Sequence, residues 1–96
     1  MLKRANITVY GQVQGVFYRS NTCQKARELN IVGWVRNEPD GSVKIIAEGE
    51  FDNLKRLIKW CHKGPGGAIT EKVEVEWEEA RGEFRDFEIR YEQILK

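Results

Sequence analysis

The chain has 96 residues, enough for one domain with a single modest core. Hydrophobic residues make up 41% and charged residues 32% of it, and the formal net charge is +1, which is typical of a globular protein and not of a disordered one. This near-balance argues against a general attraction to nucleic acid or anionic membranes, and no apolar run is long enough to span a bilayer. We therefore expect a single cytoplasmic domain over residues 1–96 that binds neither nucleic acid nor membrane.

The first third of the chain reads as a strand, a loop and a helix. Residues 5–10 alternate between apolar and polar side chains, the period of a half-buried strand. A loop with glycine at both ends of residues 11–15 follows. Residues 20–30 have helical periodicity, and Ser20 is the predicted N-cap because its hydroxyl can accept a free amide of the first turn.

The rest of the chain predicts three more strands, a second helix and a short last strand. Residues 33–37 and 43–48 form a hairpin around the turn Pro39-Asp40-Gly41. A helix capped by Asp52 runs to about Lys63, and glycines and a proline in residues 64–67 end it. The last two strands are expected over residues 73–78 and 87–91.

The element order β-α-β-β-α-β, plus a short terminal strand, predicts an α+β fold. Half-buried strands need one face covered, and two amphipathic helices can cover it. The ferredoxin-like α/β sandwich, with both helices on one face of an antiparallel sheet, meets this need. A doubly wound parallel sheet would require fully apolar strands and no tight hairpin.

The loop between the first strand and the first helix is the best candidate for chemistry. Amides at a helix N-terminus are unsatisfied and carry partial positive charge, so they favour anions. Gly15 permits close approach of a ligand, and Arg19 adds a planar fork of donors that suits phosphate. By composition alone, anion binding is one of several possibilities, because such loops are common.

Two segments resemble the acylphosphatase family. Residues 11–19 match its loop signature, G-x-V-Q-G-V-x-[FY]-R, and residues 33–37 match its second signature, G-[FYW]-[AVC]-[KR]-N. Gly64-Pro65 also lies where the family has a glycine-proline loop. Two departures are small: Gly66-Gly67 replaces a second proline, and Tyr18 replaces the commoner Phe, which adds a hydroxyl of unknown partner.

The resemblance implies a hydrolase that cleaves the carboxyl–phosphate bond of acyl phosphates without metal, cofactor or covalent intermediate. It implies that Arg19 and Asn37 are catalytic, with Asn37 orienting the water. It assigns phosphate binding to the loop, namely Gln14, Gly15, Val16, Phe17, Tyr18 and Arg19. We expect a monomer, with an acyl phosphate as substrate and phosphate or another oxyanion in the loop. Since Asn is no base at neutral pH, we favour transfer of the water's proton to the substrate phosphate.

Topology supports these two roles without the family name. In a split βαβ unit the first two strands run parallel, so Arg19 and Asn37 follow strands that end at the same edge of the sheet. The plainer interpretations are a surface arginine and a turn-forming asparagine. We interpret Trp34, Trp60 and Trp77 as structural aromatics and His62 as a surface residue.

Three alternative functions remain to be weighed. A non-catalytic anion-binding module would keep the loop but would not need Asn37. An RNA-binding domain of the same fold would require exposed aromatic residues on its central strands and a basic face. The central strands instead carry Thr8, Tyr10, Lys44 and Ile46. A domain serving carbamoyl-phosphate chemistry in a larger maturation enzyme would need partner domains.

Two cysteines do not make a disulfide framework, and one histidine gives no zinc-ligand spacing. Cys23 and Cys61 lie on the apolar faces of antiparallel helices, at the same end. We expect two buried thiols, and the alternative is a disulfide that joins the helices.

Overall fold

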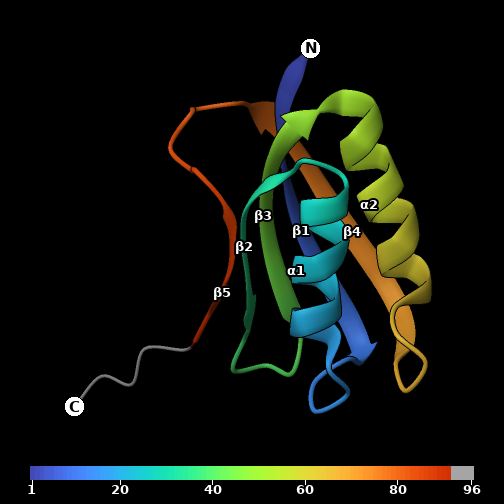
Figure 1. Ribbon diagram of the computed structural model, residues 1–96. Helices are drawn as coiled ribbons and strands as arrows, with labels where there is room; N and C mark the ends of the chain where they lie inside the picture. Colours follow the sequence, from blue (N-terminus) through green and yellow to red (C-terminus); the bar gives the residue numbers. More distant parts are fainter. Residues whose placement is uncertain (92–96) are drawn as a thin grey trace.

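The computed structural model describes residues 1–91, as seven elements shown in Figure 1. In chain order these are β1 (Leu2–Gln12), α1 (Tyr18–Glu28), β2 (Val32–Asn37), β3 (Val43–Glu50), α2 (Phe51–Lys63), β4 (Ile69–Glu79) and β5 (Phe87–Arg90). The predicted domain extends to residue 96, and residues 92–96 lie outside the described part of the chain. Neither described helix has the length and apolar content needed to cross a bilayer.

The five strands form one sheet in the order β4-β1-β3-β2-β5. β1 is antiparallel to β3 and β4, and β2 is antiparallel to β3. This confirms the predicted ferredoxin-like arrangement, with β3 between the parallel strands β1 and β2. The short terminal strand, whose direction the sequence did not predict, is β5, and it pairs parallel to β2. The reason is that residues 80–86 carry the chain from one edge of the sheet to the other at the end opposite the β1–α1 loop, so β5 returns toward that loop.

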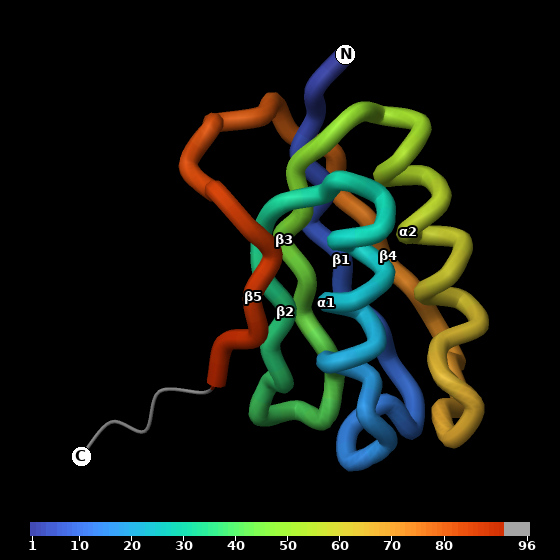
Figure 2. Tube along the Cα trace, viewed as in Figure 1, coloured from blue at the N-terminus to red at the C-terminus, as the bar shows by residue number. Residues whose placement is uncertain are grey.

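Both helices cover the same face of the sheet (Figure 2). Ala5, Ile7 and Val9 of β1 point toward them and are completely buried, as the alternation of this segment predicts. The opposite face carries no helix, and polar side chains of β1 lie on it, where Thr8 pairs with Lys44.

The helix starts differ from the prediction. α1 begins at Tyr18, two residues early, and its N-cap is Phe17 in the left-handed conformation (φ 61°). Ser20 lies inside the first turn, where its hydroxyl donates to the Phe17 carbonyl at 3.2 Å. α2 begins at Phe51 directly after β3, so its N-cap is Glu50 in an extended conformation and Asp52 lies in the first turn. Neither N-cap residue, Phe17 or Glu50, makes a side-chain cap hydrogen bond.

The three tryptophans pack as structural aromatics. Trp60 lies 5.4 Å from the ring of Tyr18 and Trp77 lies 4.8 Å from that of Phe51, centroid to centroid. Trp34 lies on the face without helices. The guanidinium carbon of Arg36, from the same strand, lies 4.7 Å from the centroid of its ring. His62 is exposed in the last turn of α2.

A buried ion pair fixes the connection between β4 and β5. Arg4 Nε donates to Glu48 at 2.7 Å, and both side chains are almost fully buried. Glu48 also accepts from the backbone amides of Arg81 (2.9 Å) and Gly82 (3.1 Å). These contacts hold residues 81–82 against the sheet and so direct β5 toward the β1–α1 loop.

Candidate active site

The segment from Gln14 to Ser20 presents free backbone donors. The amides of residues 15–20 donate no hydrogen bond to any other residue within the described range 1–91. Three of them belong to the first turn of α1, where the helix dipole adds partial positive charge. Such a row of donors is complementary to an oxyanion.

Two unusual backbone conformations shape this loop. Gly15 has φ 74°, and a Cβ added there would meet nothing within 4 Å, so the space beside it is open. Phe17 has φ 61° although it is not a glycine. A left-handed conformation costs a non-glycine residue about 1–2 kcal/mol, and such strain is concentrated at functional sites.

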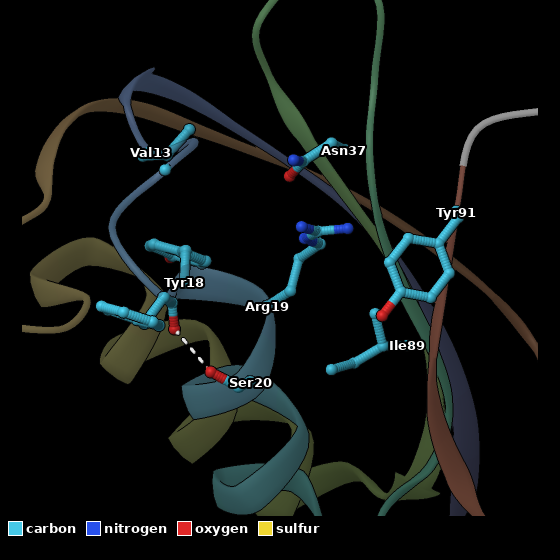
Figure 3. A pocket seen from close by; sticks show the side chains of 9 residues that line it. Val13, Tyr18, Arg19, Ser20, Asn37, Ile89 and Tyr91 are labelled. Atoms are coloured by element: carbon cyan, nitrogen blue, oxygen red, sulfur yellow. Dashed lines mark hydrogen bonds between the residues drawn. The ribbon is translucent and has the colours of Figure 1, made fainter.

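Arg19 extends from the first turn of α1 into a cavity of about 290 Å³. Figure 3 shows its side chain reaching toward Asn37 and past the ring of Tyr91. The guanidinium carbon lies 5.1 Å from the centroid of that ring, and no carboxylate of residues 1–91 forms an ion pair with Arg19. Its charge is therefore available to an anion in the cavity. The cavity is lined by Val13, Gly15, Phe17, Tyr18, Arg19, Ser20, Asn37, Ile89 and Tyr91.

Asn37 is the last residue of β2 and lines the same cavity. Its amide end faces the guanidinium of Arg19 (Figure 3). The side-chain oxygen Oδ1 is buried and has no hydrogen-bond partner among the described residues. Leaving a buried acceptor without a partner costs free energy. We therefore expect Oδ1 to accept a hydrogen bond from a bound donor. The structure thus brings Arg19 and Asn37 together, as the topology predicts.

Gln14 joins the loop to the strand end that carries Asn37. Its Nε2 donates to the carbonyls of Glu38 at 2.8 Å and Ser42 at 2.9 Å, both in the β2–β3 connection. The turn is further closed by Asp40, whose Oδ1 accepts from the amide and the hydroxyl of Ser42. These hydrogen bonds hold the pKa of Asp40 below its usual value. The Gln14 side chain therefore faces the turn and does not line the cavity.

Tyr18 anchors the other end of the loop in the core. Its ring is buried, and its hydroxyl donates to the Cys61 carbonyl of α2 at 2.7 Å, which supplies the partner that sequence alone could not name. Burial raises the pKa of this phenol far above its usual value, so it stays protonated. Gly64 lies directly against the ring: a Cβ there would be 2.8 Å from Tyr18 Cε2. Val16 also turns inward and packs against the core.

Sequence reasoning missed Val13 and Ser20, which flank the predicted loop, and two lining residues from the far end of the chain, Ile89 and Tyr91. The positions of the latter two follow from the parallel pairing of β5 with β2, which places Ile89 beside Val35 and brings the end of β5 to the edge where β2 ends. The alternation of residues 87–91 marks a strand but not its partner, so no local signal could have found them. Within residues 1–91, no three His, Cys, Asp or Glu side chains gather as a metal-binding group.

The family model described as Acylphosphatase matches residues 5–89. The chain belongs to the acylphosphatase family. It is 52% identical over 86 residues to the acylphosphatase of Marinobacter nauticus, covering 90% of this chain and 94% of the relative. It is 50% identical over 91 residues to that of Aeropyrum pernix, covering 94% of this chain and 90% of the relative. The chain is accordingly an enzyme that hydrolyses acyl phosphates.

Solved structures agree with this assignment. The acylphosphatase of Coxiella burnetii superposes with a TM-score of 0.84 at 39% identity and covers 93% of each chain. A crystal structure of full-length HypF, in a phosphate- and nucleotide-bound form, gives a TM-score of 0.86 at 26% identity. That match covers 94% of this chain but 12% of HypF, so the same fold also serves as a part of a larger protein.

Proposed function

We propose that the amides of residues 15–20 and the guanidinium of Arg19 together bind the phosphate of an acyl phosphate. The loop amides and the Arg19 guanidinium, which form no hydrogen bond or ion pair with one another or with the rest of residues 1–91, face one small cavity. An arginine can give two parallel hydrogen bonds to phosphate oxygens, and backbone amides can take the remaining ones. Preorganised donors of this kind stabilise the charge that develops during phosphoryl transfer.

Asn37 positions the attacking water. The single observation that carries this proposal is the buried Oδ1 of Asn37, which has no partner within residues 1–91 and faces Arg19 in the cavity. Oδ1 accepts a hydrogen bond from the water and so holds the water's oxygen toward the phosphorus. The oxygen–phosphorus bond forms as the bond from phosphorus to the acyl oxygen breaks, and the electron pair of that bond leaves with the carboxylate.

The proton of the water goes to an oxygen of the phosphate. Asn37 is not a base at neutral pH, and no described residue that lines the cavity is a carboxylate or histidine. A carboxylate is a good leaving group, so protonation of the departing oxygen is not required. Positioning and charge stabilisation then supply most of the acceleration. The proposed mechanism needs no metal ion and no covalent enzyme intermediate, because arginine and amides balance the phosphate charge and water is the nucleophile.

The test is hydrolysis of benzoyl phosphate in excess EDTA by the wild type and by Arg19→Ala and Asn37→Ala. Arg56→Ala and Asn53→Ala, both on α2, are matched controls. We expect Asn37→Ala to lower kcat about 100-fold or more, the usual effect of removing one transition-state contact. Its inhibition constant for inorganic phosphate should stay within about twofold, whereas Arg19→Ala should weaken phosphate binding as well.

Failure of the test would favour a different activity class. A well-folded wild type that binds phosphate but does not turn over would make the chain a non-catalytic anion-binding module. Full activity of Asn37→Ala would remove this residue from the mechanism. We further propose that the chain acts as a monomer in the cytoplasm, because the loop amides, Arg19 and Asn37 of a single chain fill every role in the proposed mechanism. Sedimentation equilibrium tests the monomer.

A further inference from the structure

The cavity beside Arg19 has an apolar wall that phosphate binding does not use. Phe17 is 80% exposed and Tyr91 is 70% exposed, although both are large aromatics. Ile89 is partly buried against the core and lies near Tyr91 (Figure 3). All three side chains belong to residues that line the cavity. Exposed apolar groups gathered at the mouth of a cavity indicate a surface for an apolar ligand.

The fold holds Phe17 in place through its backbone. Its carbonyl accepts from the amide of Asn21 at 3.1 Å, from the side-chain amide of Asn21 at 2.9 Å and from the hydroxyl of Ser20 at 3.2 Å. These bonds stabilise the left-handed conformation, while the phenyl ring itself stays in solvent. Packing does not account for an aromatic side chain at this position.

Tyr91 is placed by Arg19. The ring lies 5.1 Å from the guanidinium carbon, a distance typical of a cation–π contact. Figure 3 shows the ring on the side of Arg19 that faces β5, with Ile89 nearby and Asn37 beyond the tip of the guanidinium. The apolar wall therefore adjoins the position assigned to the phosphate.

The covalent structure of the substrate decides what this wall can contact. In an acyl phosphate a single oxygen joins the phosphorus to the acyl carbon, so the acyl group lies within a few bonds of the bound phosphate. Among the described residues that line the cavity, Arg19 alone is charged, and the phosphate takes that charge. No second described cation is there to balance a carboxylate or a second phosphate on the acyl group.

We propose that Phe17, Ile89 and Tyr91 form an acyl subsite that selects acyl phosphates with an uncharged, apolar and preferably aromatic acyl group. The inference rests on the proposed function and extends it from the phosphate to the rest of the substrate. The subsite takes the acyl group against its apolar wall as the phosphate enters the loop. A small acyl group contacts little of this wall. An anionic acyl group binds poorly, because the free-energy cost of removing its hydration is not repaid by contact with apolar side chains.

The experiment compares kcat/KM for benzoyl phosphate and acetyl phosphate in Phe17→Ala, Tyr91→Ala, the double variant and the wild type. Both substrates offer the same phosphate to the loop, so any change in phosphate binding cancels in the ratio of the two values. Intrinsic reactivity cancels as well when a variant is compared with the wild type. Phe51→Ala is the matched control, because Phe51 is an exposed aromatic at the start of α2, away from the cavity.

We expect the benzoyl-to-acetyl ratio to fall about tenfold in the double variant, which corresponds to about 1.4 kcal/mol, and to stay unchanged in Phe51→Ala. The wild type should also prefer butyryl phosphate to succinyl phosphate, which adds a carboxylate to a chain of similar length. An unchanged ratio in the double variant, or equal use of succinyl and butyryl phosphate, would overturn the subsite. Absence of turnover of every substrate by the wild type would instead overturn the proposed function, and the subsite with it.

Discussion

Gln14 and Glu38 are joined by a 2.8 Å hydrogen bond from a side-chain amide to a backbone carbonyl. Gln14 belongs to the loop that precedes Arg19, and Glu38 directly follows Asn37. The same amide nitrogen also reaches the carbonyl of Ser42 at 2.9 Å. One side chain thus ties the anion-binding loop to the end of β2, and it sets how the two halves of the cavity face one another.

Replacing Gln14 with methionine should therefore disturb catalysis more than folding. Met has a similar length but no donor, so both carbonyls lose a partner, at a cost of about 1–2 kcal/mol in the free energy of unfolding. We expect kcat to fall about tenfold at temperatures where the variant is fully folded, because misplacement by a fraction of an ångström weakens the attack. Gln24→Met, on the exposed side of α1, is the control. Unchanged kcat in Gln14→Met would show that the loop and the strand end need no such link.

Gly64 should be far less replaceable than Gly66. Gly64 has φ 66°, and a Cβ there would lie 2.8 Å from the Tyr18 ring, whereas one at Gly66 would meet nothing within 4 Å. We expect Gly64→Ala to lose about 2–3 kcal/mol of stability, the sum of a left-handed alanine and the displaced ring. Gly66→Ala should change stability by less than about 1 kcal/mol. Urea unfolding of both variants measures the difference, and equal values would contradict the packing described for Tyr18.

Glu48 should make the fold acid-sensitive. Burial alone would raise its pKa, but hydrogen bonds from the amides of Arg81 and Gly82 and from Arg4 outweigh burial and hold the pKa below the ordinary value of 4.5. As the pH falls, Glu48 is therefore protonated at a higher pH in the unfolded chain than in the folded protein. The stabilisation is therefore complete above about pH 4.5 and is lost as the pH falls through the folded-state pKa.

Urea unfolding of Glu48→Gln from pH 7 to pH 3 tests this pH dependence. At pH 7 the variant should be about 3 kcal/mol less stable than the wild type, since it removes the buried carboxylate partner of Arg4 and leaves the more exposed Glu83 as the remaining described one. The difference should shrink at acidic pH, where the wild type also loses the charge. Glu88→Gln, an exposed site, is the control. A constant difference across the pH range would rule out Glu48 as a source of acid sensitivity.

The two cysteines should be unreactive in the native state. Both are free and buried, and burial raises the pKa of Cys61 to about 12 and also raises that of Cys23. The thiolate is the reactive form, so a disulfide-exchange reagent at pH 8 should titrate neither thiol until the protein is unfolded in guanidinium. Rapid reaction of one thiol in the folded protein would contradict the burial, and absence of both thiols after unfolding would indicate the disulfide.

The sequence predicted the fold well where local pattern determines it. The alternation of residues 5–10, the turn at Pro39-Asp40-Gly41 and the order of elements led to the ferredoxin-like sandwich. The helix starts at Ser20 and Asp52 were wrong, because cap preferences describe free helix ends. Here tertiary contacts fix the entry of each helix: Phe17 is held by the loop, and Glu50 continues directly from β3.

The site was predictable only in part. Arg19 and Asn37 follow parallel strands, so topology alone brings them to one edge. The contacts of the Gln14 side chain could not be predicted, because both of its partners are backbone carbonyls and every residue type has a backbone carbonyl. Ile89 and Tyr91 were missed because no pattern in residues 80–86 predicts which strand β5 will pair with. Their path depends on the buried contacts of Glu48 with Arg81 and Gly82.

The most direct test of the mechanism is to hydrolyse benzoyl phosphate in water enriched in oxygen-18 and to locate the label by mass spectrometry. If the water held by Asn37 attacks the phosphorus held by Arg19, each inorganic phosphate will carry one labelled oxygen and the benzoate none. Label in the benzoate would mean that water attacks the acyl carbon. It would contradict the roles that we propose for Arg19, the loop amides and Asn37.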